Sequence, residues 1–93
     1  NCRVLLISPI ELGNDVWQEG YDPQFDAGSP AVSRNLKYTF AKVARKHGTD
    51  ILAASDHAKP SSIDCEHLDE NGHNALARAV EDKILSIYGR AAS

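Results

Sequence analysis

The chain has 93 residues, of which 42% are hydrophobic and 25% are charged, and its formal net charge is −3. A chain of this length forms at most one small domain and buries roughly 60–65% of its unfolded surface. Its apolar content argues against disorder over most of the length. An acidic balance without a Lys/Arg block argues against nucleic acid or an anionic membrane as the main partner.

The two ends and the cysteines bear on the origin of the chain. It begins with Asn-Cys directly before a hydrophobic stretch and contains no Met, so we expect a piece of a longer protein. It shows no signal-peptide pattern, and its longest apolar run, Val4 to Ile7, is far too short to span a bilayer. Cys2 and Cys65 do not form the pattern of a secreted scaffold, so we expect two reduced thiols and a cytoplasmic location. A bridge between them is the alternative.

The segment Arg3 to Ile10 is predicted to be a strand with both faces apolar, because its hydrophobic residues run consecutively without alternation. Such a strand belongs in a parallel sheet that is covered by helices on both sides. Pro9 ends the predicted ladder, since proline has no N–H to donate.

Residues 11–28 have no clear period and contain three glycines and three aspartates, which predicts a long irregular loop with a possible helical turn at Asp15 to Glu19. Loops of this length are uncommon in compact domains and are often functional or interfacial. Trp17, Tyr21 and Phe25 recur inside it at a spacing of four. They either pin the loop to the body of the domain, or form the wall of an acyl or alcohol pocket or a subunit contact.

A helix is predicted to begin at Ser29-Pro30, with the serine as N-cap and the proline at the first helical position, where a missing N–H costs nothing. Gly48 supplies its C-terminal stop. Between them the apolar positions form one stripe of the kind that covers a sheet. The stripe consists of Val32, Leu36, Phe40 and Val43.

Asp50 to Ser55 is predicted to be a second, short strand with Ile51 and Leu52 as its buried part. Ligand sites in open parallel sheets gather at the carboxyl ends of strands. The polar segment Asp56 to His67 starts from such an end, and we therefore expect it to form the rim of a site.

Asp69 is predicted to cap the last helix, with Glu70 in the first turn interacting favourably with the helix dipole. The helix is predicted to end at Gly89, and residues 90–93 to form a frayed tail. Its apolar stripe consists of Leu76, Ala79, Val80, Ile84 and Ile87.

Asp64 stands three residues before His67, in the non-periodic segment between the second strand and the last helix. This spacing lets the carboxylate accept a hydrogen bond from the ring Nδ1–H and leaves Nε2 free to take a proton. The pair then has the parts of an orienting acid and a general base. The alternative is a structural histidine that bonds to a nearby carboxylate.

Asp64-x-x-His67, followed by Leu68-Asp69-x-x-Gly72-His73 and a helix, resembles the C-terminal block of the SGNH (GDSL-type) hydrolases, in particular the arylesterase-like and acyltransferase-like branch. The resemblance extends over both strands and the first helix, and so over nearly the whole chain. It implies an α/β fold in which residues 1–89 form the C-terminal β-α-β-α part of a doubly wound, flavodoxin-like parallel sheet.

The same resemblance implies a serine esterase or acyltransferase that acts on carboxylic esters through an acyl-enzyme, without a cofactor. Asp64 and His67 match its catalytic acid and base. The family's nucleophile comes from a Gly-Asp-Ser block, and its oxyanion donors include an Asn from a G-x-N-D block. Gly13-Asn14-Asp15 lacks the intervening residue and is interpreted as a turn.

Because the nucleophile and oxyanion blocks do not occur here in order, we expect the chain to be inactive by itself. The N-terminal half of the same domain, on this chain or a separate one, is the expected partner. Arylesterase-like relatives are often oligomeric, so the resemblance also implies a homo-oligomer and a small-molecule ester as substrate.

Three alternatives stay open at this point. Cys65, between the Asp and the His, is a candidate nucleophile, although adjacent loop side chains usually diverge.

The four histidines have separations of ten, ten and six, without the H-x-x-x-H or C-x-x-C spacing of a metal site, so we expect no metal. The chain is alternatively an inactive fold relative that serves in assembly or binds a small molecule or carbohydrate, since two apolar strands need a further partner.

Overall fold

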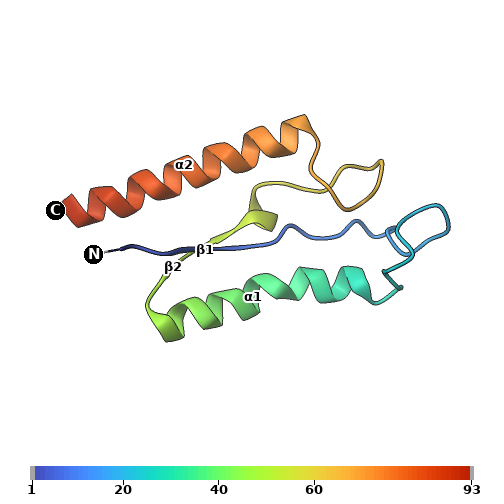
Figure 1. Cartoon of the computed structure of the whole chain (residues 1–93), viewed down its shortest axis with the longest axis horizontal. Helices are drawn as coiled ribbons and strands as arrows, with labels where there is room; N and C mark the ends of the chain where they lie inside the picture. Colours follow the sequence, from blue (N-terminus) through green and yellow to red (C-terminus); the bar gives the residue numbers. More distant parts are fainter. Residues whose placement is uncertain (1, 93) are drawn as a thin grey trace.

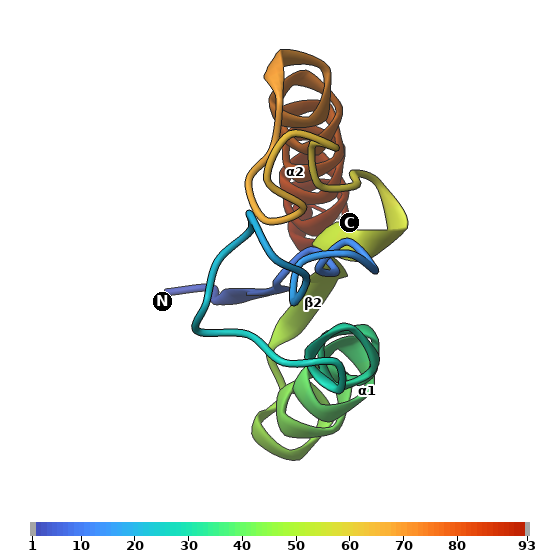
Figure 2. The same cartoon turned by 90° about the vertical axis from the view of Figure 1, so that its right-hand side faces the viewer.

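The computed structural model describes residues 2–92, with the side chains of residues 2–89. The elements follow in the order β1 (Leu5–Ser8), α1 (Ser29–His47), β2 (Asp50–Ala53), a 3₁₀ helix η1 (Ala54–Asp56) and α2 (Glu70–Ala92). Figure 1 and Figure 2 show the two strands in the middle, with α1 on one side and α2 on the other. The predicted β-α-β-α arrangement is confirmed.

The strands pair in parallel, with Leu6 opposite Ile51 and Ser8 opposite Ala53. A parallel pair needs a crossover connection, which α1 supplies. Both strands are shorter than predicted from the sequence. Pairing starts where Asp50 N–H donates to Val4 O at 3.1 Å, and it stops where the chain after Ala53 turns into η1. Beyond these points the apolar segments have no neighbouring strand among residues 2–92 to bond to.

The sequence of β1 predicts burial on both faces, but the strand is partly exposed. Ile7 is 40% exposed and Val4, directly before the strand, is 53% exposed, whereas Ser8 is fully buried. The reason is geometric: β1 has β2 on one edge only, and two helices cover only part of a sheet.

The N-cap of α1 is Gly28, not Ser29 as predicted. Asp26 organises this end instead, because its Oδ1 accepts the Gly28 N–H at 2.9 Å and the Ser29 hydroxyl at 3.2 Å. Pro30 lies in the first turn, and Gly48 ends the helix in the left-handed conformation with φ 67°, as the sequence predicts.

Small side chains form the buried face of α1. Ser33 and Ala44 are buried there. The Ser33 hydroxyl donates to Pro30 O at 2.7 Å and accepts the N–H of Leu12 at 2.9 Å, so the helix is tied to the loop that follows β1. Two members of the predicted apolar stripe face outward: Val32 is 65% exposed and Val43 is 46% exposed. The periodicity located an apolar stripe, but no element within residues 2–92 covers these two side chains.

The cap of α2 is Asp69, as predicted. Its Oδ1 accepts the N–H of Gly72 at 2.7 Å, and its main-chain oxygen accepts the N–H of His73 at 2.9 Å. The predicted stripe is covered unevenly, since Ile87 is 4% exposed and Ile84 is 41% exposed.

The C-terminal end of α2 differs from the sequence prediction. The helix continues past Gly89 to Ala92, where a tail over residues 90–93 was expected. One glycine costs a helix only about 1 kcal/mol, which is too little to end it. Ser93 lies outside the described residues. No helix within residues 2–92 combines the length and the apolar composition that crossing a membrane requires.

The molecule is flat and elongated, with extents of 52 × 29 × 17 Å and a radius of gyration of 15.2 Å. A compact chain of this length has a radius of gyration of about 12 Å and an accessible surface of about 5,300 Å². The observed surface is 6592 Å². The core is correspondingly thin, and it includes Val16, Leu52, Ala54, Ala58 and Ile87.

Candidate active site

Two long loops lie at the end of the molecule to which both strands point. Residues 9–28 follow β1, residues 57–69 follow η1, and Figure 1 shows both beyond the carboxyl ends of the strands. In open parallel sheets, ligand sites collect at this edge. The second loop brings Asp64 and His67 there, as the sequence predicts.

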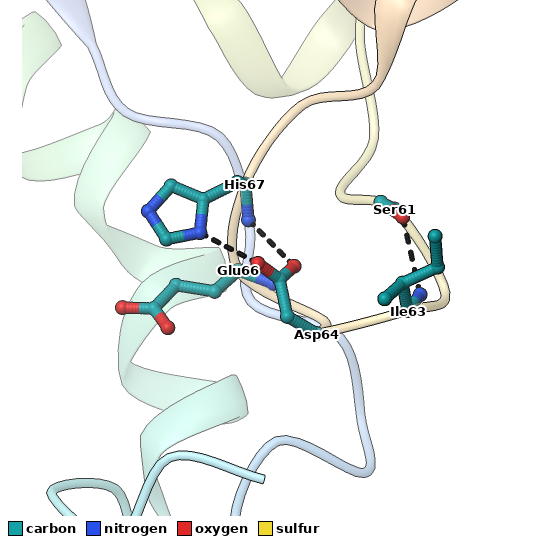
Figure 3. Close-up of polar contacts among 5 residues, drawn as sticks. All are labelled: Ser61, Ile63, Asp64, Glu66 and His67. Carbon is teal, nitrogen blue, oxygen red and sulfur yellow. Dashed lines mark hydrogen bonds and ion pairs between the residues drawn. The ribbon is translucent and has the colours of Figure 1, made fainter.

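Asp64 and His67 point toward each other (Figure 3). The Oδ2 atom of Asp64 lies 2.6 Å from Nδ1 of His67. The other carboxylate oxygen, Oδ1, accepts the backbone N–H groups of Glu66 and His67 at 3.0 Å each. One carboxylate therefore holds both the imidazole ring and the backbone from which the ring projects.

These contacts shift both pKa values in the directions that a charged pair requires. The hydrogen bond from the His67 backbone, followed by that from its ring, lowers the pKa of Asp64 to about 2. The hydrogen bond with Asp64 and the charges of Asp64 and Glu66 raise the pKa of His67 above 6.5. An ionised Asp64 favours the tautomer with the proton on Nδ1, which leaves Nε2 as the proton acceptor.

The second ring nitrogen is accessible. The His67 side chain is 76% exposed and that of Asp64 is 41% exposed. Figure 3 shows Nε2 on the side of the ring away from Asp64, with the Glu66 side chain extending on the same side as the ring. A reacting group can therefore approach Nε2 without displacing Asp64.

Ser61 closes the turn that carries the pair. Its backbone N–H donates to His67 O at 2.7 Å, its carbonyl accepts the Cys65 N–H at 2.9 Å, and its hydroxyl accepts the Ile63 N–H at 3.1 Å. We call residues 61–67 the Asp-His turn. This role of Ser61 was not predicted, although a serine hydroxyl often accepts the N–H of the residue two positions later in a loop.

The three predicted aromatic residues differ in their surroundings, and their role in substrate binding stays a prediction. Trp17 is 45% exposed. Phe25 lines a hollow with Leu12 and Val32 on the α1 side. Of the three, Tyr21 approaches the Asp-His turn: it is half-buried, and the electrostatic influence of the nearby Cys65 is the first cause that raises the pKa of Tyr21.

Successive tight turns replace the helical turn expected at Asp15 to Glu19. Val16 N–H donates to Gly13 O at 3.1 Å and Gln18 N–H donates to Asp15 O at 3.0 Å. Gly13 and Asn14 thus form part of a turn, as predicted. Because the segment is not helical, the spacing of four does not place the aromatic side chains on one face.

Several serine hydroxyls serve local structure. Those of Ser29, Ser33 and Ser61 are bonded to Asp26, Pro30 and the Ile63 N–H respectively. These three side chains are therefore engaged away from Nε2 of His67, and the expectation that the nucleophile lies outside this sequence stays a prediction.

No family model and no curated protein sequence matches this chain. Solved structures do match it. One crystal structure superposes on 94% of this chain with a TM-score of 0.84 and 30% sequence identity. Est24, a carbohydrate acetylesterase from Sinorhizobium meliloti, matches with a TM-score of 0.75 at 25% identity over 91% of this chain. A candidate arylesterase from Agrobacterium tumefaciens matches with a TM-score of 0.73 at 22% identity over 91% of this chain, and it bears on the fold alone.

The chain spans 39% of the length of each of these three solved chains. The two neighbours whose activity is named are ester hydrolases. The chain therefore has part of an ester-hydrolase fold, with the Asp-His turn at the carboxyl edge of its sheet.

Proposed function

We propose that the chain is part of an SGNH-type ester hydrolase and that it supplies the acid and the base of a serine esterase or acyltransferase. In this proposal Asp64 orients the ring and His67 Nε2 takes the proton of the attacking serine. The observation that carries it is the 2.6 Å contact between Asp64 Oδ2 and His67 Nδ1, beside a ring that is 76% exposed.

The proposed reaction has two proton transfers through His67. As the serine oxygen attacks the ester carbonyl, its proton moves to Nε2, and the imidazolium that forms is stabilised by the ionised Asp64. The imidazolium then protonates the leaving alkoxide, which departs as the alcohol and leaves an acyl-serine. Water in a hydrolase, or a second alcohol in an acyltransferase, repeats these steps to release the acyl group.

The serine and the oxyanion donors belong, in this proposal, to a further segment of the same domain, on this chain or a separate one. Its support is the uncovered surface: the accessible area exceeds that of a compact chain by about 1,300 Å². In a protein–protein interface of standard size, each partner buries roughly 800 Å² of its accessible surface. Apolar side chains of β1, α1 and α2 contribute to the excess, among them Ile7, Val32, Val43, Ile84 and Leu85.

Two properties of the whole protein follow as parts of the proposal. Acetylated carbohydrates are the first substrates to test, because Est24 is a carbohydrate acetylesterase. A cytoplasmic location is proposed from the two cysteines, which are both free, with Cys2 exposed and Cys65 buried.

His67→Ala tests the catalytic assignment in the chain combined with its completing segment. We expect hydrolysis of p-nitrophenyl acetate to fall by at least about a thousandfold, since the general base is lost. The matched control is His47→Ala, which removes an exposed histidine at the end of α1. Turnover that survives His67→Ala in a folded protein removes the assignment.

The exposed apolar faces also favour a second candidate, in which the chain is an assembly or small-molecule-binding module without turnover. Val32 is 65% exposed and Leu85 is 62% exposed, on two different helices. Size-exclusion chromatography with light scattering tests the need for a partner. A cooperatively folded monomer of the 93-residue chain would contradict both the assembly role and the need for a completing segment.

A further inference from the structure

A glycine of the first loop and a cysteine of the second meet at the Asp-His turn. The N–H of Gly13 donates a 2.8 Å hydrogen bond to the carbonyl of Cys65. Cys65 follows Asp64 directly, the residue is 7% exposed, and its backbone is left-handed with φ 59°. A non-glycine residue adopts this conformation when its surroundings hold it there.

The contact leaves no room for a side chain at position 13. A Cβ on Gly13 would lie 2.6 Å from Cys65 Cβ, 2.8 Å from Sγ and 3.1 Å from Cα. Two of these atoms cannot swing aside, because they are the backbone carbon and the first side-chain carbon. Glycine is needed here for close approach of two chain segments.

The hydrogen bonds made by Ser61 and the bond from Gly13 differ in what they hold. Ser61 belongs to the Asp-His turn, so its bonds to Cys65 and His67 set the shape of the turn. Gly13 belongs to the loop that follows β1, and the neighbouring Leu12 N–H is bonded to Ser33 of α1. The Gly13 bond therefore ties the turn to the helix and the sheet.

We propose that Gly13 and Cys65 are positioning residues that set where Asp64 and His67 stand relative to the rest of the site. The inference rests on the proposed function. Because Cys65 is bonded covalently to Asp64, a displacement of Cys65 moves the carboxylate that orients the ring. A misplacement of about 1 Å in a catalytic group is enough to cost on the order of a hundredfold in rate.

Gly13→Ala in the full chain tests the inference by NMR titration of the His67 ring. The added methyl group displaces Cys65 and weakens the bond between Asp64 and His67, which is the first cause of the raised His67 pKa. We expect the pKa of His67 to fall toward 6.5. Gly89→Ala is the control, since nothing lies within 4 Å of a Cβ at that position.

A compensating substitution guards against simple misfolding. Cys65→Gly removes the two closest atoms and suits the left-handed backbone, so adding it to Gly13→Ala should restore the wild-type His67 pKa. If Gly13→Ala does not fold, the double variant decides. A double variant that stays unfolded, or folds without the raised pKa, overturns the inference. So does a folded Gly13→Ala protein with the wild-type pKa, even if its unfolding midpoint has dropped.

Kinetics in the completed enzyme distinguish this inference from the proposed function. Gly13→Ala should lower kcat by roughly 10- to 100-fold with little change in KM, because ring placement and not substrate binding is affected. If His67→Ala keeps its turnover while Gly13→Ala shifts the ring pKa, the positioning role stands and the catalytic function fails. If His67→Ala loses its turnover while Gly13→Ala leaves the ring pKa unchanged, the positioning role alone fails.

Discussion

The carboxylate of Asp64 binds the ring of His67 with one oxygen and the backbone N–H of the same residue with the other. Both bonds span three residues of one loop, so they need no contribution from a distant part of the chain. An acid and a base can thus be pre-assembled on a partial domain. What such a pair lacks is a defined place relative to a substrate, and the loop after β1 provides the tie to the sheet.

Asp64→Asn should separate the two jobs of this carboxylate. An amide oxygen can still accept the N–H groups of Glu66 and His67, so the turn is expected to keep its shape. The amide nitrogen then faces Nδ1 and favours the opposite tautomer, with the proton on Nε2. We expect kcat of the completed enzyme to fall by about 10³–10⁴-fold and the pKa of His67 to fall. Unchanged turnover in the variant would remove the orienting role of Asp64.

As pH rises through the raised pKa of His67, activity should increase while stability decreases. The folded state raises the pKa of His67 above 6.5 and lowers that of Asp64 from 3.8 to about 2. Stabilisation by the charged pair is therefore complete between pH 3.8 and pH 6.5, which are the ordinary pKa values of the two groups. It is lost as pH rises through the raised His67 pKa, and as pH falls toward 2. The base works when neutral, so kcat/KM should rise with pH through a value above 6.5.

Denaturant unfolding over a pH series checks the stability side, and initial rates check the activity side. His67→Ala is the control, because it should flatten the decline in stability at the alkaline end. A kcat/KM profile that falls as pH rises past 6.5 would rule out His67 as a general base with the shifted pKa described here.

Gly48→Ala should lower the free energy of unfolding by about 1 kcal/mol, since an alanine in the left-handed region is strained. Gly48 has φ 67° at the C-cap of α1, and a Cβ there meets nothing within 4 Å, so backbone strain acts alone. Gly89→Ala, in the interior of α2 and equally free of neighbours, should be neutral or stabilising. Equal effects of the two substitutions in urea titrations would refute this account.

Ser8→Ala should raise the free energy of unfolding by about 1 kcal/mol, because a buried hydroxyl without a partner costs desolvation energy. Within residues 2–92, the Ser8 Oγ atom is fully buried without a hydrogen-bond partner. Ser33→Ala is the matched comparison. It removes a buried hydroxyl with two hydrogen bonds and should lower stability by about 1–2 kcal/mol. Destabilisation by Ser8→Ala would indicate that the hydroxyl finds a partner in the completing segment.

Features set within a few residues were readable without coordinates. The contact of Asp64 with His67, the cap at Asp69 and the left-handed stop at Gly48 each depend on spacing and side-chain chemistry inside one turn of chain. The parallel pairing of the strands followed from their consecutive apolar residues and the helix between them. The cap of α1 was missed because Gly28 is the N-cap, and Asp26, which lies outside the helix, holds Gly28 and the Ser29 side chain at this end.

Features that depend on what arrives from elsewhere in the chain needed the tertiary structure. The periodicity of α1 gives an apolar stripe, yet Ser33 and Ala44 form the buried face while Val32 stays exposed, because burial depends on which surfaces are present to cover a helix. In the same way, no residue near Gly13 in the sequence predicts its contact with Cys65. That contact joins residues far apart along the chain, and only the path of both loops over the edge of the sheet brings them within bonding distance.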